Sequence, residues 1–268
     1  MRESRWPNGA YCAVNITVDF DGESIDIVNA PDKTMGGRYS YGRYAVKIGL
    51  TRILNLLREQ NVRATFFVPG WDAEQHPEKI REIIADGHEI AAHGYLHEDF
   101  SKLGDGERSI LEKTHAALTN ITGVSPKGWR APRGLMSSRT HRLLKELGYL
   151  YDSSFNNDDL PYLIEIDGAK SGMVELPQFG FLDDGPLYEV YKTPRTVEKL
   201  WKEEFDAIYE EGLFFSLKLH PRGDAGSGRA VRIRAIDELL SYIKRHPGIW
   251  FATSAEVAEW WLERGKIS

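Results

Sequence analysis

The stretch that most restricts the fold is Ala13-Val14-Asn15-Ile16-Thr17-Val18-Asp19-Phe20-Asp21, a mainly apolar run that ends in carboxylates. A run of this length, rich in β-branched residues, is typical of a strand that is buried on both faces of a sheet. Carboxylates seldom follow such a run without a partner, because burying an unpaired charge is costly. The stretch therefore predicts a central strand that delivers Asp19 and Asp21 at its carboxyl end.

Short apolar runs of the same kind alternate with helical patterns along the whole chain. Strands are expected at residues 13–19, 64–68, 89–92, 128–130, 149–153, 174–177, 214–219 and 249–253. Helices are expected at residues 44–60, 77–85, 106–122, 138–147, 197–211, 231–245 and 255–263. Thr193-Pro194 is typical of a helix start, and Thr253-Ser254-Ala255-Glu256 has the form of a capping box. Alternating strands and helices predict an α/β protein with parallel strands joined by crossovers.

Roughly seven or eight such units could close into a barrel resembling the (β/α)₈ fold. An open, doubly wound sheet is the alternative, although the chain contains no glycine-rich nucleotide-binding fingerprint. A Gly-rich insertion at 23–43 and an irregular stretch with one strand at 156–192 interrupt the units, and both could cover the barrel mouth. We find no linker or repeat, so residues 1–268 are expected to form a single catalytic domain.

Composition excludes several classes of protein. The chain has 268 residues, 41% of them hydrophobic, which is enough for one large core. The net charge is −6, and no basic stripe indicates nucleic-acid binding. The single cysteine, Cys12, excludes an internal disulfide and Cys-rich metal sites.

The N-terminal residues contain no apolar stretch typical of a secretion signal. No segment approaches the roughly 18 consecutive apolar residues of a membrane-spanning helix. We therefore expect a cytoplasmic protein without membrane contact, unless a secretion signal precedes these residues in the cell.

The segment Ala91-Ala92-His93-Gly94-Tyr95-Leu96-His97 carries the strongest chemical signal. Two imidazoles four residues apart can reach one point in space, and imidazole is a common ligand of divalent metals. A carboxylate from Asp19 or Asp21 would complete two His and one carboxylate, a set that leaves an open position for water. Surface or capping chemistry is the structural alternative for the histidine pair.

Polar residues end several of the expected strands. The candidates are Asp19, Asp21, His93, His97, Arg130, Asp152 and His220. In parallel barrels the chemistry sits at the carboxyl ends of the strands, where such side chains meet. Their shared position is a stronger indication of an active site than any one of them.

At these residues the chain resembles the polysaccharide deacetylase superfamily, also called the NodB-homology or carbohydrate esterase 4 superfamily. The resemblance covers roughly residues 13–260. It rests on Thr17-Val18-Asp19-Phe20-Asp21-Gly22, Arg63-Ala64-Thr65-Phe66-Phe67-Val68, His93 to His97, Arg130-Ala131-Pro132-Arg133-Gly134 and Leu217-Lys218-Leu219-His220-Pro221. It implies a distorted (β/α)₇-type barrel.

Two departures from the family pattern point to a subgroup. Phe20 separates the two aspartates, which are usually adjacent, and Gly94 follows the first histidine in place of Ser or Thr. In both positions the chain resembles a group of sequences that contains cyclic-imide hydrolases, allantoinase-like enzymes and intracellular peptidoglycan-deacetylase homologues. That likeness implies a homo-oligomer, often a tetramer.

The resemblance also implies roles for the site residues. Asp21, His93 and His97 would hold one divalent metal, with Zn²⁺ expected and Co²⁺, Mn²⁺, Fe²⁺ or Ni²⁺ also fitting the ligand set. Asp19 would be the general base, His220 the general acid, Arg130 the partner of the base, and the backbone N–H of Arg133 an oxyanion donor. Asp19 could instead cap a helix, His220 could be a core histidine, and Arg130 could be an ion-pair scaffold. For Asp152, orienting Arg130 and capping the turn with Ser153 both stay open.

These roles predict a metal-dependent hydrolase of non-peptide carbon–nitrogen bonds. A small cyclic imide, ureide or amide is the expected substrate, because wall polysaccharide lies outside the cytoplasm. An N-deacetylase of N-acetylated sugar or peptidoglycan is the alternative, and a non-catalytic metal- or sugar-binding module is a second one. The nearby aromatic residues Trp71, Tyr95, Trp129 and Phe155 could form an apolar pocket wall or ordinary core packing.

Overall fold

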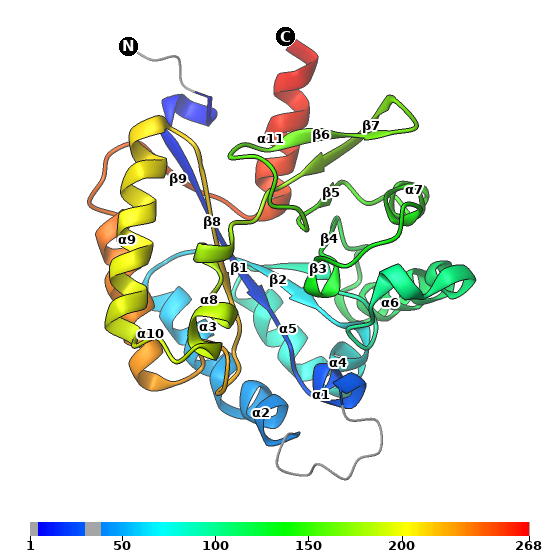
Figure 1. Ribbon diagram of the computed structural model, residues 1–268, viewed down its shortest axis with the longest axis horizontal. Helices are drawn as coiled ribbons and strands as arrows, with labels where there is room; N and C mark the ends of the chain where they lie inside the picture. The colour runs from blue at the N-terminus through cyan, green and yellow to red at the C-terminus, as the bar shows by residue number, and fades with distance from the viewer. Residues whose placement is uncertain (1–4, 30–38, 268) are drawn as a thin grey trace.

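The computed structural model describes residues 5–29 and 39–267, so part of the expected insertion at 23–43 lies outside the described residues. A sheet of nine strands forms its centre (Figure 1). The strands are β1 (Cys12–Asp19), β2 (Thr65–Val68), β3 (Glu89–Ala92), β4 (Gly128–Trp129), β5 (Tyr151–Asp152), β6 (Tyr162–Ile166), β7 (Ala169–Glu175), β8 (Phe214–Leu219) and β9 (Ile249–Phe251).

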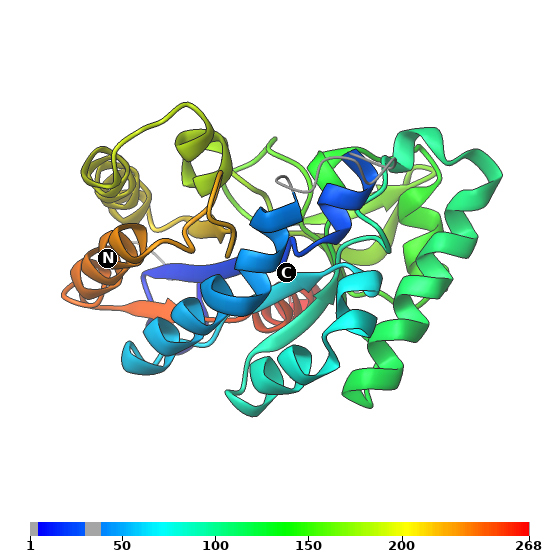
Figure 2. The same ribbon diagram turned by 90° about the horizontal axis from the view of Figure 1, so that it is seen from below.

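Helices lie around the outside of this sheet, as the view from below shows (Figure 2). They are α1 (Ser24–Asn29), α2 (Tyr39–Tyr44), α3 (Leu50–Glu59), α4 (Gly70–Gln75), α5 (Pro77–Ala85), α6 (Glu107–Thr122), α7 (Thr140–Glu146), α8 (Asp184–Glu189), α9 (Pro194–Glu211), α10 (Ala230–Ile243) and α11 (Ser254–Ile267). Among the described residues no helix is both long enough and apolar enough to cross a membrane.

Strand β1 is the centre of the sheet, as its sequence predicts, and every one of its residues is buried. Thr17 pairs with both Thr65 of β2 and Lys218 of β8, so these strands lie on opposite edges of β1. Strand β9 pairs with the first residues of β1. All these pairs are parallel, which brings the carboxyl ends of β1, β2 and β8 to one edge of the sheet.

The sheet runs in the order β6-β7-β5-β4-β3-β2-β1-β8 and does not close by a strand pair between β7 and β8 in the described residues. The segment after β7 fills this gap, because Asp183 forms an isolated parallel bridge with Lys218 of β8. The predicted α/β class and distorted barrel are confirmed, with a ring of strands that a loop completes.

The prediction of one strand in the irregular stretch 156–192 is wrong. This stretch contains an antiparallel hairpin of β6 and β7, and the short helix α8 follows it. Asp167 and Gly168 form its turn, both with positive φ. The sequence-based prediction missed this hairpin because it rests on strands that alternate with helices, and no helix separates β6 from β7.

Most other elements lie within a few residues of their predicted bounds, because local signals define them. The side chain of Thr193 caps α9, and Thr253 exchanges hydrogen bonds with Glu256 at the start of α11, as expected of a capping box. The short helices α1, α2, α4 and α8 were not predicted. Each has only six residues, which is too short for a periodic apolar pattern to separate it from a loop.

Candidate active site

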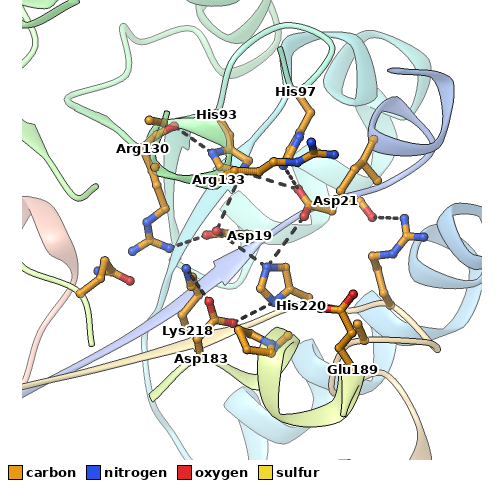
Figure 3. A pocket seen from close by; sticks show the side chains of 18 of the residues that line it. Asp19, Asp21, His93, His97, Arg130, Arg133, Asp183, Glu189, Lys218 and His220 are labelled. Atoms are coloured by element: carbon orange, nitrogen blue, oxygen red, sulfur yellow. Dashed lines mark hydrogen bonds and ion pairs between the residues drawn. The ribbon is translucent and has the colours of Figure 1, made fainter. Parts of the chain in front are cut away.

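A cavity of about 480 Å³ opens at the carboxyl ends of the parallel strands. The residues to which the sequence analysis assigned metal, catalytic or oxyanion roles line it: Asp19, Asp21, His93, His97, Arg130, Arg133 and His220. Both insertions contribute walls, with Asp26 and Asn29 from the first and Gln178 and Glu189 from the second. Figure 3 shows how the predicted site residues converge on the cavity from the ends of strands β1 and β8 and from the loops after β3 and β4.

Asp21, His93 and His97 form a buried cluster whose ligand atoms lie close enough for one metal ion. The Oδ1 atom of Asp21 is 3.7 Å from Nε2 of His93 and 3.8 Å from Nε2 of His97 (Figure 3). These separations are too long for hydrogen bonds, but two ligands bonded to one ion at roughly 2.1 Å lie about 3.4 Å apart.

The ligand atoms of the cluster are free to bind a metal. Asp21 Oδ1 is buried and has no hydrogen-bond partner among the described residues. His93 donates from Nδ1 to the carbonyl oxygen of Arg130 at 2.9 Å, which leaves its Nε2 lone pair facing Asp21. Burial lowers the pKa of His93 to about 4 and that of His97 to about 4, so both imidazoles are neutral and able to ligate. The residues present therefore fit a divalent metal.

The backbone places His97 in an unusual conformation. Its φ is +62°, in the left-handed region that non-glycine residues rarely adopt. The preceding loop is held by Glu98, whose carboxylate accepts the backbone N–H groups of Tyr95 and Leu96 at 2.9 Å each. Gly94 also has positive φ, and a Cβ atom there would meet Glu98 and Pro132 at 3.0–3.1 Å. This explains the glycine that departs from the family pattern.

Asp19 ends β1 and forms a buried ion pair with Arg130, whose Nη1 donates to Asp19 Oδ1. The other oxygen, Oδ2, is 3.9 Å from Nε2 of His93 and 3.9 Å from Nε2 of His220. Burial alone would raise the pKa of Asp19, but electrostatic interactions with Arg130, His93, Lys218 and His220 together outweigh it and hold that pKa well below its usual range. Asp19 is therefore an ionised carboxylate that faces the cavity.

His220 follows β8 and lies opposite the histidine pair, with its Nε2 3.8 Å from Asp21 Oδ2. Its Nδ1 bonds to Oδ1 of Asp184 at 2.6 Å, and its backbone N–H donates to Oδ2 of the same carboxylate at 3.0 Å. Burial lowers the pKa of His220, but the charge and hydrogen bond of Asp184, together with the charges of Asp183 and Asp21, raise it to about 10. Asp184 is a site residue that the sequence analysis missed.

Arg133 lies in the turn after β4 with a φ of +55°. Its backbone N–H finds no acceptor in the described part of the chain, and its guanidinium donates to Oδ1 of Asn29 at 2.6 Å. Gly134 N and Leu135 N close the turn onto the carbonyls of Ala131 and Pro132. The turn therefore leaves one unpaired N–H beside the cavity.

The four aromatic residues for which a pocket wall and core packing both stayed open do not form a wall of this cavity. Among the described residues none of Trp71, Tyr95, Trp129 and Phe155 lines the cavity. Trp129 is fully buried against Phe100, because β4 points its side chain into the core. Polar and charged side chains line the cavity instead.

Arg222 is a second residue that the sequence analysis missed. It is 6% exposed, pairs with Asp26 at 2.9 Å, and donates to the carbonyl oxygen of Gly22 at 3.2 Å. It thereby holds the loop that carries Asp21. Asp152 does not line the cavity, and it binds the side chains of His141 and Ser154. Asp152 therefore does not orient Arg130 directly. Arg130 forms hydrogen bonds to Ser153 instead.

Comparison with known proteins gives consistent results. The family model described as polysaccharide deacetylase matches residues 39–151. A crystal structure from Mycobacterium smegmatis, assigned to the polysaccharide deacetylases, is 37% identical, with a TM-score of 0.88 over 100% of this chain and 96% of that one. Puue allantoinase is 26% identical, with a TM-score of 0.85 over 96% of this chain and 92% of that one. The peptidoglycan deacetylase of Helicobacter pylori is 29% identical over 84% of this chain and 87% of its own length.

Deacetylases and allantoinase both hydrolyse carbon–nitrogen bonds that are not peptide bonds. The enzyme class predicted from the sequence is therefore confirmed by these relatives.

Proposed function

This chain belongs to the polysaccharide deacetylase family, and we propose that it is a metal-dependent hydrolase of a small amide, imide or ureide. The observation that carries the proposal is the convergence of Asp21, His93 and His97 around an unpartnered carboxylate oxygen. Asp19 and His220 face the same point from the other side of the cavity. A base and a hydrogen-bond donor that both lie close to three metal ligands suit hydrolysis.

Asp21 Oδ1, His93 Nε2 and His97 Nε2 would hold the ion, and Zn²⁺ fits this mixture of nitrogen and oxygen ligands. Co²⁺, Mn²⁺, Fe²⁺ and Ni²⁺ accept the same ligands. When bound, a divalent ion supplies Lewis-acid polarisation of the scissile carbonyl and lowers the pKa of water.

Asp19 would act as the general base through Oδ2, because Arg130 occupies its Oδ1. The ion pair keeps the carboxylate ionised and fixes its orientation, so Oδ2 can accept a proton from the attacking water. Arg130 is in turn held by Ser153, whose carbonyl and hydroxyl oxygens accept its Nε and Nη2 protons.

His220 would deliver a proton from Nε2 to the leaving nitrogen. Its Nδ1 bonds to Asp184, which fixes the ring and points Nε2 into the cavity. The backbone N–H of Arg133 would donate to the oxyanion that forms when water adds to the carbonyl. His220 and the Arg133 N–H both lie in loops that follow strands, β8 and β4 respectively.

The cavity walls support the small-substrate proposal. Ile25, Ala131, Pro186 and Ala225 are the apolar side chains among the described lining residues, and no aromatic ring offers a stacking surface for a sugar. Arg133 and Glu189 instead present a cation and an anion at the mouth (Figure 3). The carbonyl oxygens and N–H groups of an imide or ureide could pair with these charged side chains. The similarity to Puue allantoinase also supports a substrate of this kind.

An N-deacetylase of N-acetylated sugar or peptidoglycan is the second candidate. Phe179, Phe181 and Tyr191 are 44%, 53% and 93% exposed, and they lie in the segment that forms one wall of the cavity. Exposed rings close in the chain to cavity-lining residues suit a polymeric sugar, and the peptidoglycan deacetylase of Helicobacter pylori matches most of this chain. Cytoplasmic location and a tetrameric assembly stay predictions, which cell fractionation and light scattering would test.

A paired turnover assay tests the proposal. Metal-loaded and chelated protein would be supplied with succinimide, hydantoin and allantoin in one arm, and with N-acetylglucosamine oligomers in the other. Metal-dependent ring opening is the expected result. Acetate release from the sugars alone would replace the small-substrate proposal with the deacetylase, and no turnover in either arm would overturn both.

A further inference from the structure

Two buried carboxyl groups, Asp152 and Glu175, lie outside the catalytic cavity. Asp152 ends β5, Glu175 ends β7, and the two residues are direct partners in the parallel pairing of these strands. Both side chains are 0% exposed. Burial, and the charge of Asp152, raise the pKa of Glu175 well above its usual range. A buried carboxyl group beside another carboxylate favours its protonated form, so Glu175 is the group of the pair that is expected to hold a proton.

Each oxygen of the pair has a defined neighbour. Glu175 Oε1 accepts the backbone N–H groups of Ser154 at 2.9 Å and Phe155 at 2.8 Å. Its Oε2 is buried and has no hydrogen-bond partner in the described part of the chain. One ligand atom each of Glu175, Asp152 and His141 lies within 4.8 Å of the others. Asp152 accepts the hydroxyl of Ser154 on Oδ1 at 2.5 Å and bonds to Nε2 of His141 on Oδ2 at 2.8 Å. Ser154 is therefore held at both its backbone and its side chain.

Ser154 and its neighbour Ser153 in turn hold the loop after β4. The hydroxyl oxygen of Ser154 accepts the backbone N–H of Ala131 at 2.9 Å. The carbonyl oxygen of Ser153 accepts Nε of Arg130 at 2.9 Å, and its hydroxyl accepts Nη2 at 3.1 Å. Ala131 lies between Arg130, which pairs with Asp19, and Arg133, whose backbone N–H has no acceptor in the described part of the chain.

We infer that Asp152 and Glu175 are positioning residues: through Ser154 they fix the peptide of Ala131, and thereby align Arg130 and the Arg133 N–H. Neither carboxyl contacts the reacting atoms. The inference rests on the proposed function, because it takes the Arg133 N–H as the oxyanion donor. It assigns a role to Asp152 that its position at a strand end alone does not reveal.

Four variants test this positioning role. Ser154→Ala removes the acceptor for the Ala131 N–H, and Glu175→Leu removes the acceptor for two N–H groups. Glu175→Gln is the conservative variant, because its amide reproduces both the acceptor oxygen and the donor of a protonated carboxyl. Ser171→Ala is the matched control, since Ser171 is equally buried and its hydroxyl likewise accepts a backbone N–H, that of Met173 at 3.0 Å.

Two measurements apply to each variant. Hydrogen exchange of the peptide that contains Ala131 should be faster in Ser154→Ala and Glu175→Leu, and unchanged in Glu175→Gln and Ser171→Ala. The kcat should fall about tenfold or more in the first two variants with KM and metal content retained, below the loss of roughly 10²–10³ for removing an oxyanion donor outright.

The outcomes separate this inference from the proposed function. If the wild-type protein turns over none of the substrates but the exchange pattern is as expected, the positioning of the loop stands and the proposed function fails. If the wild-type protein is active and Ser154→Ala matches Ser171→Ala in both measurements, the inference is wrong. Loss of activity in Glu175→Gln equal to that in Glu175→Leu would also overturn it.

Discussion

The Nδ1 atom of His220 lies 2.6 Å from Oδ1 of Asp184, although His220 follows β8 and Asp184 lies in the short helix α8, 36 positions earlier. The carboxylate also accepts the backbone N–H of His220, so it fixes both the ring and the chain that carries it. A histidine held in this way presents Nε2 to the cavity in one orientation.

Replacing Asp184 by Asn should lower kcat by about 10²-fold or more, because the ring loses the partner that fixes its tautomer and charge. KM and metal affinity should change little, since Asp184 is not among the expected ligands. Steady-state kinetics and metal titration would measure both effects. Asp206→Asn, on the outer helix α9, is the control. Activity close to wild type in Asp184→Asn would show that His220 does not act as the proton donor.

One equivalent of divalent metal should bind the wild-type protein at the cluster of Asp21, His93 and His97, and His97→Ala should reduce binding sharply, because it removes one of these three ligands. Isothermal titration with Zn²⁺ and elemental analysis would give the stoichiometry without relying on turnover. His115→Ala, a histidine on α6 outside the cavity, should bind as the wild type does. Undiminished binding in His97→Ala would place the metal elsewhere.

Asp19→Asn should keep its metal and lose most of its turnover, by about 10²-fold or more, since an amide cannot accept the proton of the attacking water. The volume of the side chain is unchanged and Arg130 keeps an oxygen acceptor. The key comparison is therefore metal content against kcat in the same preparation. A variant with most of its activity intact would mean that another group is the base.

The guanidinium and the backbone N–H of Arg133 should have separable effects. Asn tolerates the positive φ of this position, so Arg133→Asn should preserve the turn and its N–H while removing the charge at the cavity mouth. We expect KM for an imide or ureide to rise by about tenfold, as for the loss of a charged hydrogen bond, with kcat nearly unchanged. A fall in kcat at constant KM would instead assign the side chain to the chemical step.

Glu175 should make the stability of the fold depend on pH. Because its pKa is raised in the folded protein, this group favours folding most strongly at low pH. That contribution is lost as the pH rises above about 4.3, the value in the unfolded chain, by roughly 1.4 kcal/mol per pH unit until the folded pKa is reached. The glutamine in Glu175→Gln does not titrate. The free energy of unfolding of this variant should therefore increase relative to that of the wild type as the pH rises.

Urea denaturation at several values between about pH 5 and about pH 8 would measure this difference. Glu165→Gln, an exposed glutamate on β6, is the control and should follow the wild-type curve. Parallel curves for Glu175→Gln and the wild type would contradict a protonated Glu175.

Local sequence determined most of the helices and strands of this protein. The apolar run before Asp19, the capping residues Thr193 and Thr253, and the spacing of His93 and His97 act within a few residues of one another. Strand ends in a parallel sheet meet at one edge, so the sequence also predicted that the candidate site residues would converge.

Only the tertiary structure decided which residues far apart in the chain support that site. Asp184 reaches His220 from an unpredicted helix, Arg222 reaches Asp26 from 196 positions away, and Asp152 meets Glu175 through strand pairing. Neither the β6–β7 hairpin nor the loop that completes the ring of strands has a strong local signal. Their positions depend on burial and on hydrogen bonds between distant segments, which no periodicity along the chain encodes.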